Sequence, residues 1–385
     1  MFTNTELLPT LLRVLPKAPT IKLIVYDGEP KPKMLEDLRT VRDTITVVSI
    51  DELRAIGRGE SADILKERVP KKEDVAFIMY TSGSTGNPKG VVLTHANLVA
   101  SIGAVSVLLG HHLTKEDTFL AYLPLAHVLE FIVELIMFFS GLPVGYGRVK
   151  TLTDASVRNC KGDINTFRPS IMVGVPAVWE TIRKGLLSTV DAGGSLTRNL
   201  FHGAVYLKRH NIPILAQLAD KFVLSKVRGA TGGRLRIGLS GGAAISRETQ
   251  EFLSTVLLLL VQGQLTVLIE VYFFLIGNYL PLGYGMTESC GMCAILPPEL
   301  HQYNVVGLPV PSVEIKLLDV PDAGYFAKGN PQQGEVCIRG PSVTSGYYKR
   351  PDLNSDETIF TQDGWLRTGD IGQWNPDGTL SLIDR

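Results

Sequence analysis

Near the start of the chain, apolar and polar residues alternate in a way that predicts strands separated by a helix. The apolar, β-rich runs at 20–27 (TIKLIVYD) and 45–50 (ITVVSI) predict two strands, and the charged helical pattern at 33–43 lies between them. This order is typical of an α/β unit with parallel strands. The charged segment 65–74 (LKERVPKKED) is predicted to be a surface connection.

A run of small polar residues follows the next apolar stretch. Val75–Tyr80 is predicted to be a short buried strand, and Gly90–Gly103 to be a strand end followed by a helix that Thr94 or Asn97 caps. Between them, Thr81–Gly90 reads TSGSTGNPKG. A small-residue loop between a strand and a helix presents backbone N–H groups to an anion, so the pattern predicts a phosphate-binding loop. A Ser/Thr-rich turn without function is the alternative.

The spacing within this loop excludes two common phosphate-binding motifs. No pair of glycines has the spacing that a Walker A motif requires, and the Rossmann pattern GxGxxG is absent. The pattern that remains, TSGSTGxPKG, resembles the nucleotide-binding loop of the adenylate-forming superfamily. This resemblance implies that the following residues bind ATP: Thr81, Ser82, Gly83, Ser84, Thr85, Gly86 and Lys89.

The segment GYGMTESCG (283–291) resembles the same superfamily. The resemblance implies that Tyr284 lies against the adenine ring, since a flat aromatic face stacks on a base. It also implies that Glu288 coordinates Mg²⁺ together with Thr81, because Mg²⁺ requires hard oxygen ligands. The neighbours Gly285, Met286 and Thr287 are expected to contact the nucleotide as well.

Two other segments complete the implied nucleotide pocket. LSGGAAIS (239–246) resembles the adenine-pocket segment, in which Gly241, Gly242 and Ala243 would let a flat ring lie along the backbone; a strand-to-helix turn capped by Ser246 is compatible with this. In GWLRTGDIG (364–372), the two oxygens of Asp370 suit the vicinal hydroxyls of a ribose, and Arg385 occupies the second ribose-contacting place.

The segment LPLAHVLEF (123–131) carries the residues implied for the acyl substrate. By resemblance His127 lies near the acyl carboxylate and lines the active site, although a lone His beside an apolar helix is often a core residue. Phe131 falls at the position of the aromatic gate of a fatty-acyl tunnel, a place that is often Trp in the family. Glu130 and Glu134 stand one turn apart and are predicted to form the polar face of this helix rather than a catalytic pair.

The run DGWLRTGDIGQWNPDGTLSLIDR (363–385) resembles the signature of fatty acyl-CoA synthetases, and nearly the whole chain is similar to the long-chain enzymes of eukaryotes, in particular fungi. The resemblance implies that a long-chain fatty acid is activated with ATP and Mg²⁺ to an acyl-adenylate and then transferred to coenzyme A. Thr81, Lys89, His127 and Glu288 would be the catalytic residues. A coumarate-type ligase and a catalytically dead ATP- or acyl-binding fragment remain as alternatives.

Composition narrows the partners further. The chain has 385 residues with 38 basic and 38 acidic side chains, and this balance gives no support to nucleic-acid binding. Its four cysteines do not make a disulfide framework, and Cys290 and Cys293 are predicted to be small buried residues rather than a redox or metal pair. The first residues lack the pattern of a secretory signal, so intracellular surroundings are expected. By resemblance these are the cytosolic face of the endoplasmic reticulum, peroxisome or lipid droplet; peripheral membrane association and a homo-oligomer stay open.

The resemblance implies an α/β fold, the large N-terminal domain of adenylate-forming enzymes with two α/β subdomains and a small β-rich one. The expected divisions are a partial α/β subdomain at 1–74, an α/β subdomain at 75–306 and a β-rich subdomain at 307–385, whose strands include a hairpin turning at Asn375–Gly378. Full-length relatives continue into a mobile C-terminal domain, so the chain is expected to be a central fragment, incomplete at both ends and impaired in activity.

The apolar run at 264–283 departs from the family pattern, because removing it restores a normal join before Tyr284. A retained intron or gene-model error is the first interpretation, a true insertion the second and a transmembrane anchor the third. Twenty apolar residues are enough to cross a bilayer as a helix. Gln264, Glu270 and Asn278 interrupt the run, however, and it lies between two halves of one implied pocket.

Overall fold

The computed structural model describes residues 1–81, 87–210, 212–241, 245–257, 283–297, 300, 302 and 304–384. The chain divides into two compact units, Met1–Pro70 and Lys71–Arg385. Each unit has its own hydrophobic core, and each is described by itself below.

The Met1–Pro70 unit is a small α/β layer whose strands are all parallel. Its strands are β1 (Phe2–Asn4), β2 (Leu23–Asp27) and β3 (Thr46–Ser49), in the order β1-β2-β3, and its helices are α1 (Leu8–Val14), α2 (Pro32–Thr40), α3 (Ile50–Arg58) and α4 (Asp63–Lys66). The two predicted strands and the helix between them are confirmed. Leu8, Ile24 and Leu38 are fully buried in one core. The helices that precede and follow β2 in the sequence, α1 and α2, therefore both pack in this core.

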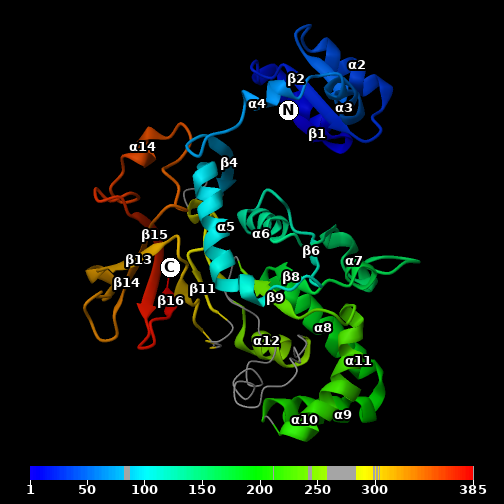
Figure 1. Ribbon diagram of the computed structural model, residues 1–385, viewed down its shortest axis with the longest axis vertical. Coiled ribbons are helices and arrows are strands. Elements are labelled where there is room, and N and C mark those ends of the chain that lie inside the picture. The colour runs from blue at the N-terminus through cyan, green and yellow to red at the C-terminus, as the bar shows by residue number, and fades with distance from the viewer. Residues whose placement is uncertain are drawn as a thin grey trace. The chain divides into compact units, whose positions relative to one another are not determined.

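A four-stranded parallel sheet forms the centre of the Lys71–Arg385 unit (Figure 1). Its strands, in spatial order, are β7 (Val144–Tyr146), β6 (Phe119–Ala121), β8 (Ile171–Gly174) and β9 (Ile237–Ser240). Phe119 and Leu120 are adjacent and both buried, yet they belong to different cores because successive strand residues face opposite sides. The sheet is therefore covered on both faces, as parallel sheets usually are.

Different helices cover these two faces. One core contains side chains of α5 (His95–Leu109) and α6 (Val128–Phe139). The other contains those of α8 (Pro176–Ala192), α9 (Gly194–Arg209), α11 (Ser225–Arg228) and α12 (Arg247–Phe252). Further short α-helices of this unit are α7 (Asp163–Phe167), α10 (Pro213–Ala219) and α14 (Pro351–Asn354).

The segment that carries the predicted phosphate loop is an antiparallel hairpin, β4 (Val75–Thr81) with β5 (Lys89–Thr94). The predicted strand at Val75–Tyr80 is confirmed, but its predicted burial is wrong, because only Met79 of β4 is buried. The loop joins two strands rather than a strand and a helix. The helix begins afterwards at His95, where the Thr94 side chain accepts the Asn97 N–H in a reciprocal capping box, so Thr94 is the N-cap.

The C-terminal part of the unit is β-rich, as predicted. An antiparallel sheet has the order β13 (Glu314–Leu318), β14 (Gln333–Arg339), β15 (Leu366–Trp374) and β16 (Leu380–Asp384). The predicted hairpin turn is confirmed, since the Gly378 N–H donates to the Asn375 carbonyl at 3.0 Å. A smaller antiparallel sheet consists of β10 (Gly283–Tyr284), β11 (Ala294–Ile295) and β12 (Leu308–Pro309).

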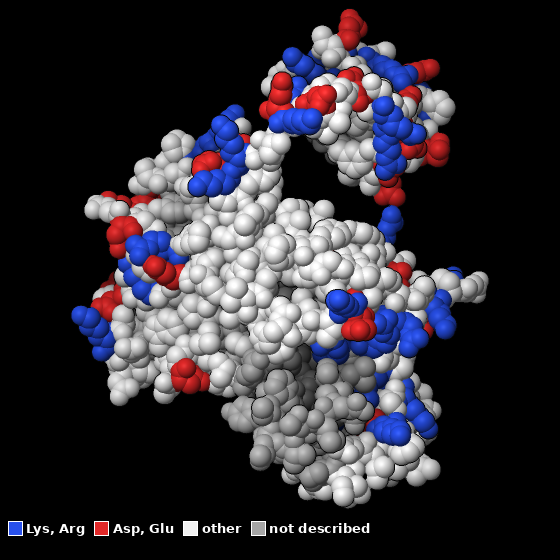
Figure 2. Space-filling model, viewed as in Figure 1, with Lys and Arg blue, Asp and Glu red and all other residues white. Residues whose placement is uncertain are grey.

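Charged side chains on the face shown in Figure 2 lie in small groups of mixed sign, and the middle of the Lys71–Arg385 unit on this face is mostly uncharged. Within the described ranges, no helix has the length and apolar character needed to cross a bilayer. The apolar run at 264–282 lies outside the described residues.

Candidate active site

A cavity of about 490 Å³ lies in the Lys71–Arg385 unit, and segments far apart in the sequence contribute to its wall. They are the end of β4, the start of β5, the start of α6, the end of β9, the stretch 283–292 and parts of the β-rich region. The predicted site residues found in the wall are Thr81, Lys89, His127, Gly241, Gly285, Met286, Thr287 and Glu288. The fold therefore brings the main predicted motifs together.

Thr81 and Lys89 lie opposite each other where the β4–β5 hairpin opens into the predicted phosphate loop. They are the last Cα partners of the antiparallel ladder. Directly opposite strand residues have Cβ atoms about 5 Å apart, so the hydroxyl and the ammonium flank the base of the loop. Ser82, Gly83, Ser84, Thr85 and Gly86, all predicted to bind ATP, lie outside the described residues.

His127 stands at the N-terminus of α6, and both its position and its protonation follow from its capping role. The Nδ1 atom of its ring accepts the Leu129 N–H at 3.3 Å, which leaves the proton on Nε2. His127, Val128 and Leu129 line the cavity, so the positive end of the helix dipole faces it. A helix start of this kind favours an anion.

Glu288 is held in a tight loop that depends on close backbone approach. It lies in the single helical turn Thr287–Ser289, is 7% exposed and lines the cavity. A Cβ on Gly285 would stand 1.7 Å from the Gly291 carbonyl oxygen, so only glycine fits there. The Thr344 N–H donates to the Glu288 carbonyl at 2.7 Å and joins this loop to the β-rich region.

The sequence analysis did not predict some residues of the cavity wall, and Tyr347 is the most informative of these residues. Its hydroxyl donates to Glu288 Oε1 at 2.9 Å. Arg367 also lines the cavity and is paired with Glu335, which accepts its Nε at 2.8 Å. No spacing rule could have linked Tyr347 to Glu288, because they are 59 positions apart and meet only through tertiary pairing.

Tyr284 and Asp370 are in contact with each other, but neither is in the cavity wall. The Tyr284 hydroxyl donates to Asp370 Oδ2 at 2.8 Å, and Tyr284 is 7% exposed and belongs to the core. Phe131 packs edge-on against Phe77, with ring centroids 4.7 Å apart, and also lies outside the wall. Adenine stacking, ribose binding and gating by these residues stay predictions. Gly242, Ala243 and Arg385 lie outside the described residues.

The donor set at the cavity suits a cation held mainly by substrate oxygens. Thr81 offers a hydroxyl and Glu288 a carboxylate whose Oε1 already accepts Tyr347. Across the described part of the chain, no group of three or more His, Cys, Asp or Glu is arranged to hold a metal ion. Mg²⁺ usually binds proteins through one or two carboxylates plus phosphates and water, so this sparse set fits the predicted Mg²⁺.

The expectation that Glu130 and Glu134 form the polar face of α6 is wrong. Glu130 is fully buried and Glu134 is 7% exposed. Neither Glu130 oxygen makes a hydrogen bond of ordinary geometry within the described structure, although the Tyr122 and Leu123 N–H groups face it. Burial first, and the Glu134 charge second, raise the pKa of Glu130 to about 8. The cause of the error is that α6 enters the core with its first turn, so both sides of the helix are covered.

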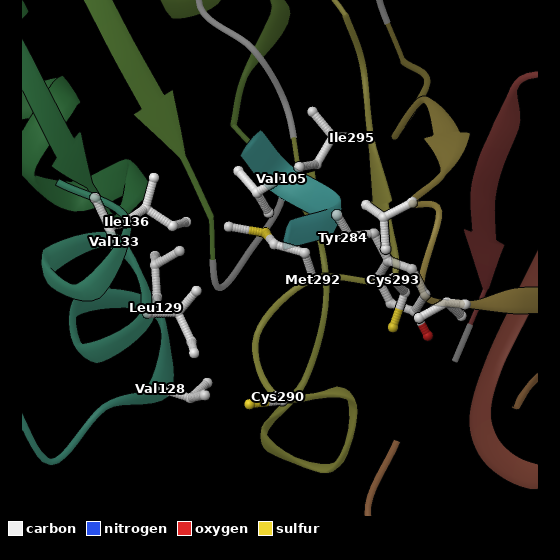
Figure 3. Packing of buried hydrophobic residues seen from close by; sticks show 14 of the residues in the cluster. Val105, Val128, Leu129, Val133, Ile136, Tyr284, Cys290, Met292, Cys293 and Ile295 are labelled. Atoms are coloured by element: carbon white, nitrogen blue, oxygen red, sulfur yellow. The ribbon is translucent and has the colours of Figure 1, made fainter. Parts of the chain in front are cut away.

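A second, apolar cavity adjoins the first. It lies among α5, α6 and the strands of the parallel sheet, and Met292 and Leu239 belong to its wall. Met292 also lines the larger cavity, and Figure 3 shows its side chain extending towards Leu129, Val133 and Ile136 of α6. The apolar cavity is narrow, about 50 Å³, so a flexible Met side chain at its junction matters for access.

The cysteines behave as predicted. Cys290 and Cys293 are fully buried, and they are free thiols. Burial raises the pKa of each thiol to about 12. Reactive cysteines need a lowered pKa and access to solvent, so these two residues serve packing.

Comparison with known proteins places the chain in a family. The sequence profile described as AMP-binding enzyme matches residues 2–348. The chain belongs to the AMP-binding enzyme family. Long-chain-fatty-acid–CoA ligase 2 of Schizosaccharomyces pombe is 43% identical over 100% of this chain and 53% of its own length. Long-chain-fatty-acid–CoA ligase 1 of Saccharomyces cerevisiae is 40% identical over 100% and 54%. The resemblance to fungal enzymes is confirmed, and the chain spans about half the length of the curated relatives it matches.

Solved structures of other proteins show the same fold. The O-succinylbenzoate coenzyme A synthetase MenE of Bacillus subtilis, in complex with ATP and a magnesium ion, matches with a TM-score of 0.60 and 22% identity over 98% of this chain and 62% of its own. The N-terminal domain of FACL13 from Mycobacterium tuberculosis matches with a TM-score of 0.61 and 20% identity over 98% and 77%. These likenesses confirm the predicted fold class.

Proposed function

We propose that this protein activates a long-chain fatty acid with ATP, giving an acyl-adenylate and pyrophosphate, and transfers the acyl group to coenzyme A in a second step. The observation that carries the proposal is the pairing of two adjacent cavities. The wall of the larger one contains Thr81, Lys89 and Glu288, and the smaller one is apolar. The names of the fungal relatives, long-chain-fatty-acid–CoA ligases, support the substrate class.

In the first step a carboxylate oxygen attacks the α-phosphorus of ATP, a P–O bond forms, and pyrophosphate leaves with the bonding electrons. Both reactants are anions, so the protein's task is to hold them in line and neutralise charge. Lys89 supplies a positive charge, and the N-terminus of α6 adds the positive end of a helix dipole. When bound, Mg²⁺ would be held by Thr81 and Glu288 and would neutralise phosphate charge.

The fatty acid is proposed to lie between the two cavities. His127 Nε2–H can donate to the carboxylate, since Nδ1 is already used for the helix cap. The hydrocarbon chain would then extend past Met292 towards the apolar cavity. Because the apolar cavity is narrow, a long chain requires movement of its lining side chains, and Met accommodates such movement better than a branched residue.

The test is ATP–pyrophosphate exchange driven by a fatty acid, measured on the 385-residue chain and on two variants of α5. Leu109→Phe places a larger side chain in the wall of the apolar cavity, whereas Val107→Phe places it on the exposed side of the same helix, where Val107 is 69% exposed. We expect palmitate-driven exchange to fall about tenfold in Leu109→Phe, hexanoate-driven exchange to change little, and Val107→Phe to match the original chain.

Equal effects on palmitate and hexanoate would contradict the placement of the acyl chain. ATP binding without exchange by any fatty acid would contradict the catalytic proposal for this chain. It would favour instead an ATP- or acyl-binding fragment with a regulatory or interaction role.

A further inference from the structure

Tyr347 contacts two residues of the proposed site at once. Its hydroxyl donates to Glu288 Oε1 at 2.9 Å, and Lys89 Nζ lies 5.4 Å from the centre of its ring. The residue is 5% exposed and its ring packs against Phe360 at 6.1 Å between centroids. An aromatic ring attracts a cation at this distance, so one side chain touches both the acidic and the basic member of the site.

The backbone of Tyr347 is fixed on both sides. Tyr347 pairs with Val91 of β5, and the Tyr348 N–H donates to the Gly90 carbonyl at 2.7 Å. On the other side, Asn354 accepts the Tyr347 N–H at 2.8 Å and donates to its carbonyl at 3.0 Å. The side chain therefore starts from a rigid base, as a group that must orient another group requires.

Gly346 shows how closely this clamp fits. Its φ is +147°, and a Cβ there would stand 2.7 Å from Asn354 Oδ1. A larger residue would push Asn354 away from Tyr347. The segment thus uses glycine to allow the two-sided hold.

We propose that Tyr347 is a positioning residue of the nucleotide site, which turns the Glu288 carboxylate towards the cation that accompanies ATP and holds the Lys89 ammonium beside it. This inference rests on the proposed function. With one lone pair of Oε1 used by the hydroxyl, Oε2 keeps both of its lone pairs for a hard cation. Removing a group that orients a metal ligand in this way typically lowers metal affinity by roughly 10- to 100-fold.

The bond from the Tyr347 hydroxyl to Glu288 distinguishes a positioning role from a purely structural one. A purely structural role, filling space beside Phe360, would need the ring but not the hydroxyl.

Tyr347→Phe separates the two roles because it keeps the ring and removes only the hydroxyl. Tyr348→Phe is the matched control, since Tyr348 is the next residue and is 43% exposed. Mn²⁺ is the probe: its binding to the ATP-saturated 385-residue chain is followed by electron paramagnetic resonance, and ATP affinity is measured separately in EDTA. We expect Tyr347→Phe to weaken Mn²⁺ binding about tenfold, with ATP affinity in EDTA unchanged and Tyr348→Phe like the original chain.

A double-mutant cycle with Glu288→Gln keeps the proposal falsifiable if Tyr347→Phe loosens the fold. Tyr347→Phe should add nothing once Glu288 has lost its charge, whereas a structural defect would add its full effect. Unchanged Mn²⁺ affinity in Tyr347→Phe would overturn the role of Tyr347 alone. A loss of ATP affinity in EDTA as large as the loss of Mn²⁺ affinity would do the same. Failure of the original chain to bind Mn²⁺ with ATP would overturn the proposed function and this inference together.

Discussion

Glu130 shows how burial can change the chemistry of one residue without a specific partner. A carboxyl group that is fully removed from water favours its neutral form, because a buried charge without hydrogen bonds is costly. The nearby Glu134 increases this preference. The side chain is therefore a neutral acid at neutral pH, one turn after His127, and its ionisation opposes folding.

The free energy of unfolding should reveal this group. The pKa of Glu130 is about 8 in the folded chain and near 4.5 when unfolded, so the folded state binds the extra proton between these values. The contribution of Glu130 to the free energy of unfolding then falls as pH rises from 4.5 to 8, by about 1.4 kcal/mol per pH unit. Between pH 5.5 and 8 the original chain should lose on the order of 3 kcal/mol of unfolding free energy through this group. The Glu130→Gln variant cannot ionise and should not show this loss in urea denaturation.

The control for this measurement is Glu116→Gln, the same change at an exposed position. That variant should keep the pH dependence of the original chain. If Glu130→Gln loses as much stability as the original chain between the two pH values, Glu130 does not titrate as proposed.

At the scale of elements, the sequence predicted what depends on local pattern and missed what depends on packing. The strands around Val25, the helix cap at Thr94 and the turn at Gly378 follow from neighbouring residues, and all were found. The burial of Glu130 and the link from Tyr347 to Glu288 depend on which elements meet, and residue patterns do not contain that information. The small-residue pattern at Thr81–Gly90 predicted an anion-binding loop, whereas the roles of His127 and Glu288 were accessible only through family resemblance.

An ion pair fixes the edge of the parallel sheet. Arg236, next to β9, donates its Nε to Asp117 Oδ1 at 2.8 Å, and Asp117 is 2% exposed. Ser170 donates to the same Oδ1 at 2.6 Å. Burial opposes ionisation, but these hydrogen bonds outweigh it and lower the pKa of Asp117. The carboxylate therefore joins β6, β8 and β9 at one edge.

Arg236→Gln should destabilise the chain by about 3 to 5 kcal/mol, because it leaves a buried charge without its partner. Arg339→Gln is the comparison, since its pair with Glu314 is exposed and should contribute about 1 kcal/mol or less. Urea denaturation at neutral pH measures both. Similar losses in the two variants would contradict the importance of burial.

At the scale of the whole molecule, the division at Pro70 separates a small unit from the one that holds the cavity. All residues in the described wall of the cavity lie in Lys71–Arg385. The Met1–Pro70 unit has a core of its own around Leu8, Ile24 and Leu38, but a unit of this size buries only about 60% of its unfolded surface and is marginal in stability.

Residues 71–385, expressed alone, should therefore bind ATP within about twofold of the whole chain, because each unit has its own core and the described cavity wall lies in this one. Isothermal titration calorimetry of both proteins gives the comparison, and circular dichroism verifies that the shorter one is folded. A folded 71–385 that has lost ATP affinity would show that the first unit contributes to the nucleotide site.

The pairing of β5 with the segment around Tyr347 has a consequence for the order in which the chain acquires its site. A two-stranded hairpin is marginally stable alone, and the third partner of β4–β5 comes from residues far along the chain: Thr344 and Val92 are separated by 252 positions. Contacts of such long range form slowly and late. During synthesis, Thr81 and Lys89 are thus made early but gain their final geometry only after the β-rich part has emerged and docked. The proposed nucleotide affinity would then depend on completed folding, and a chain stalled before Tyr347 would expose an edge of β5 that could pair with another molecule.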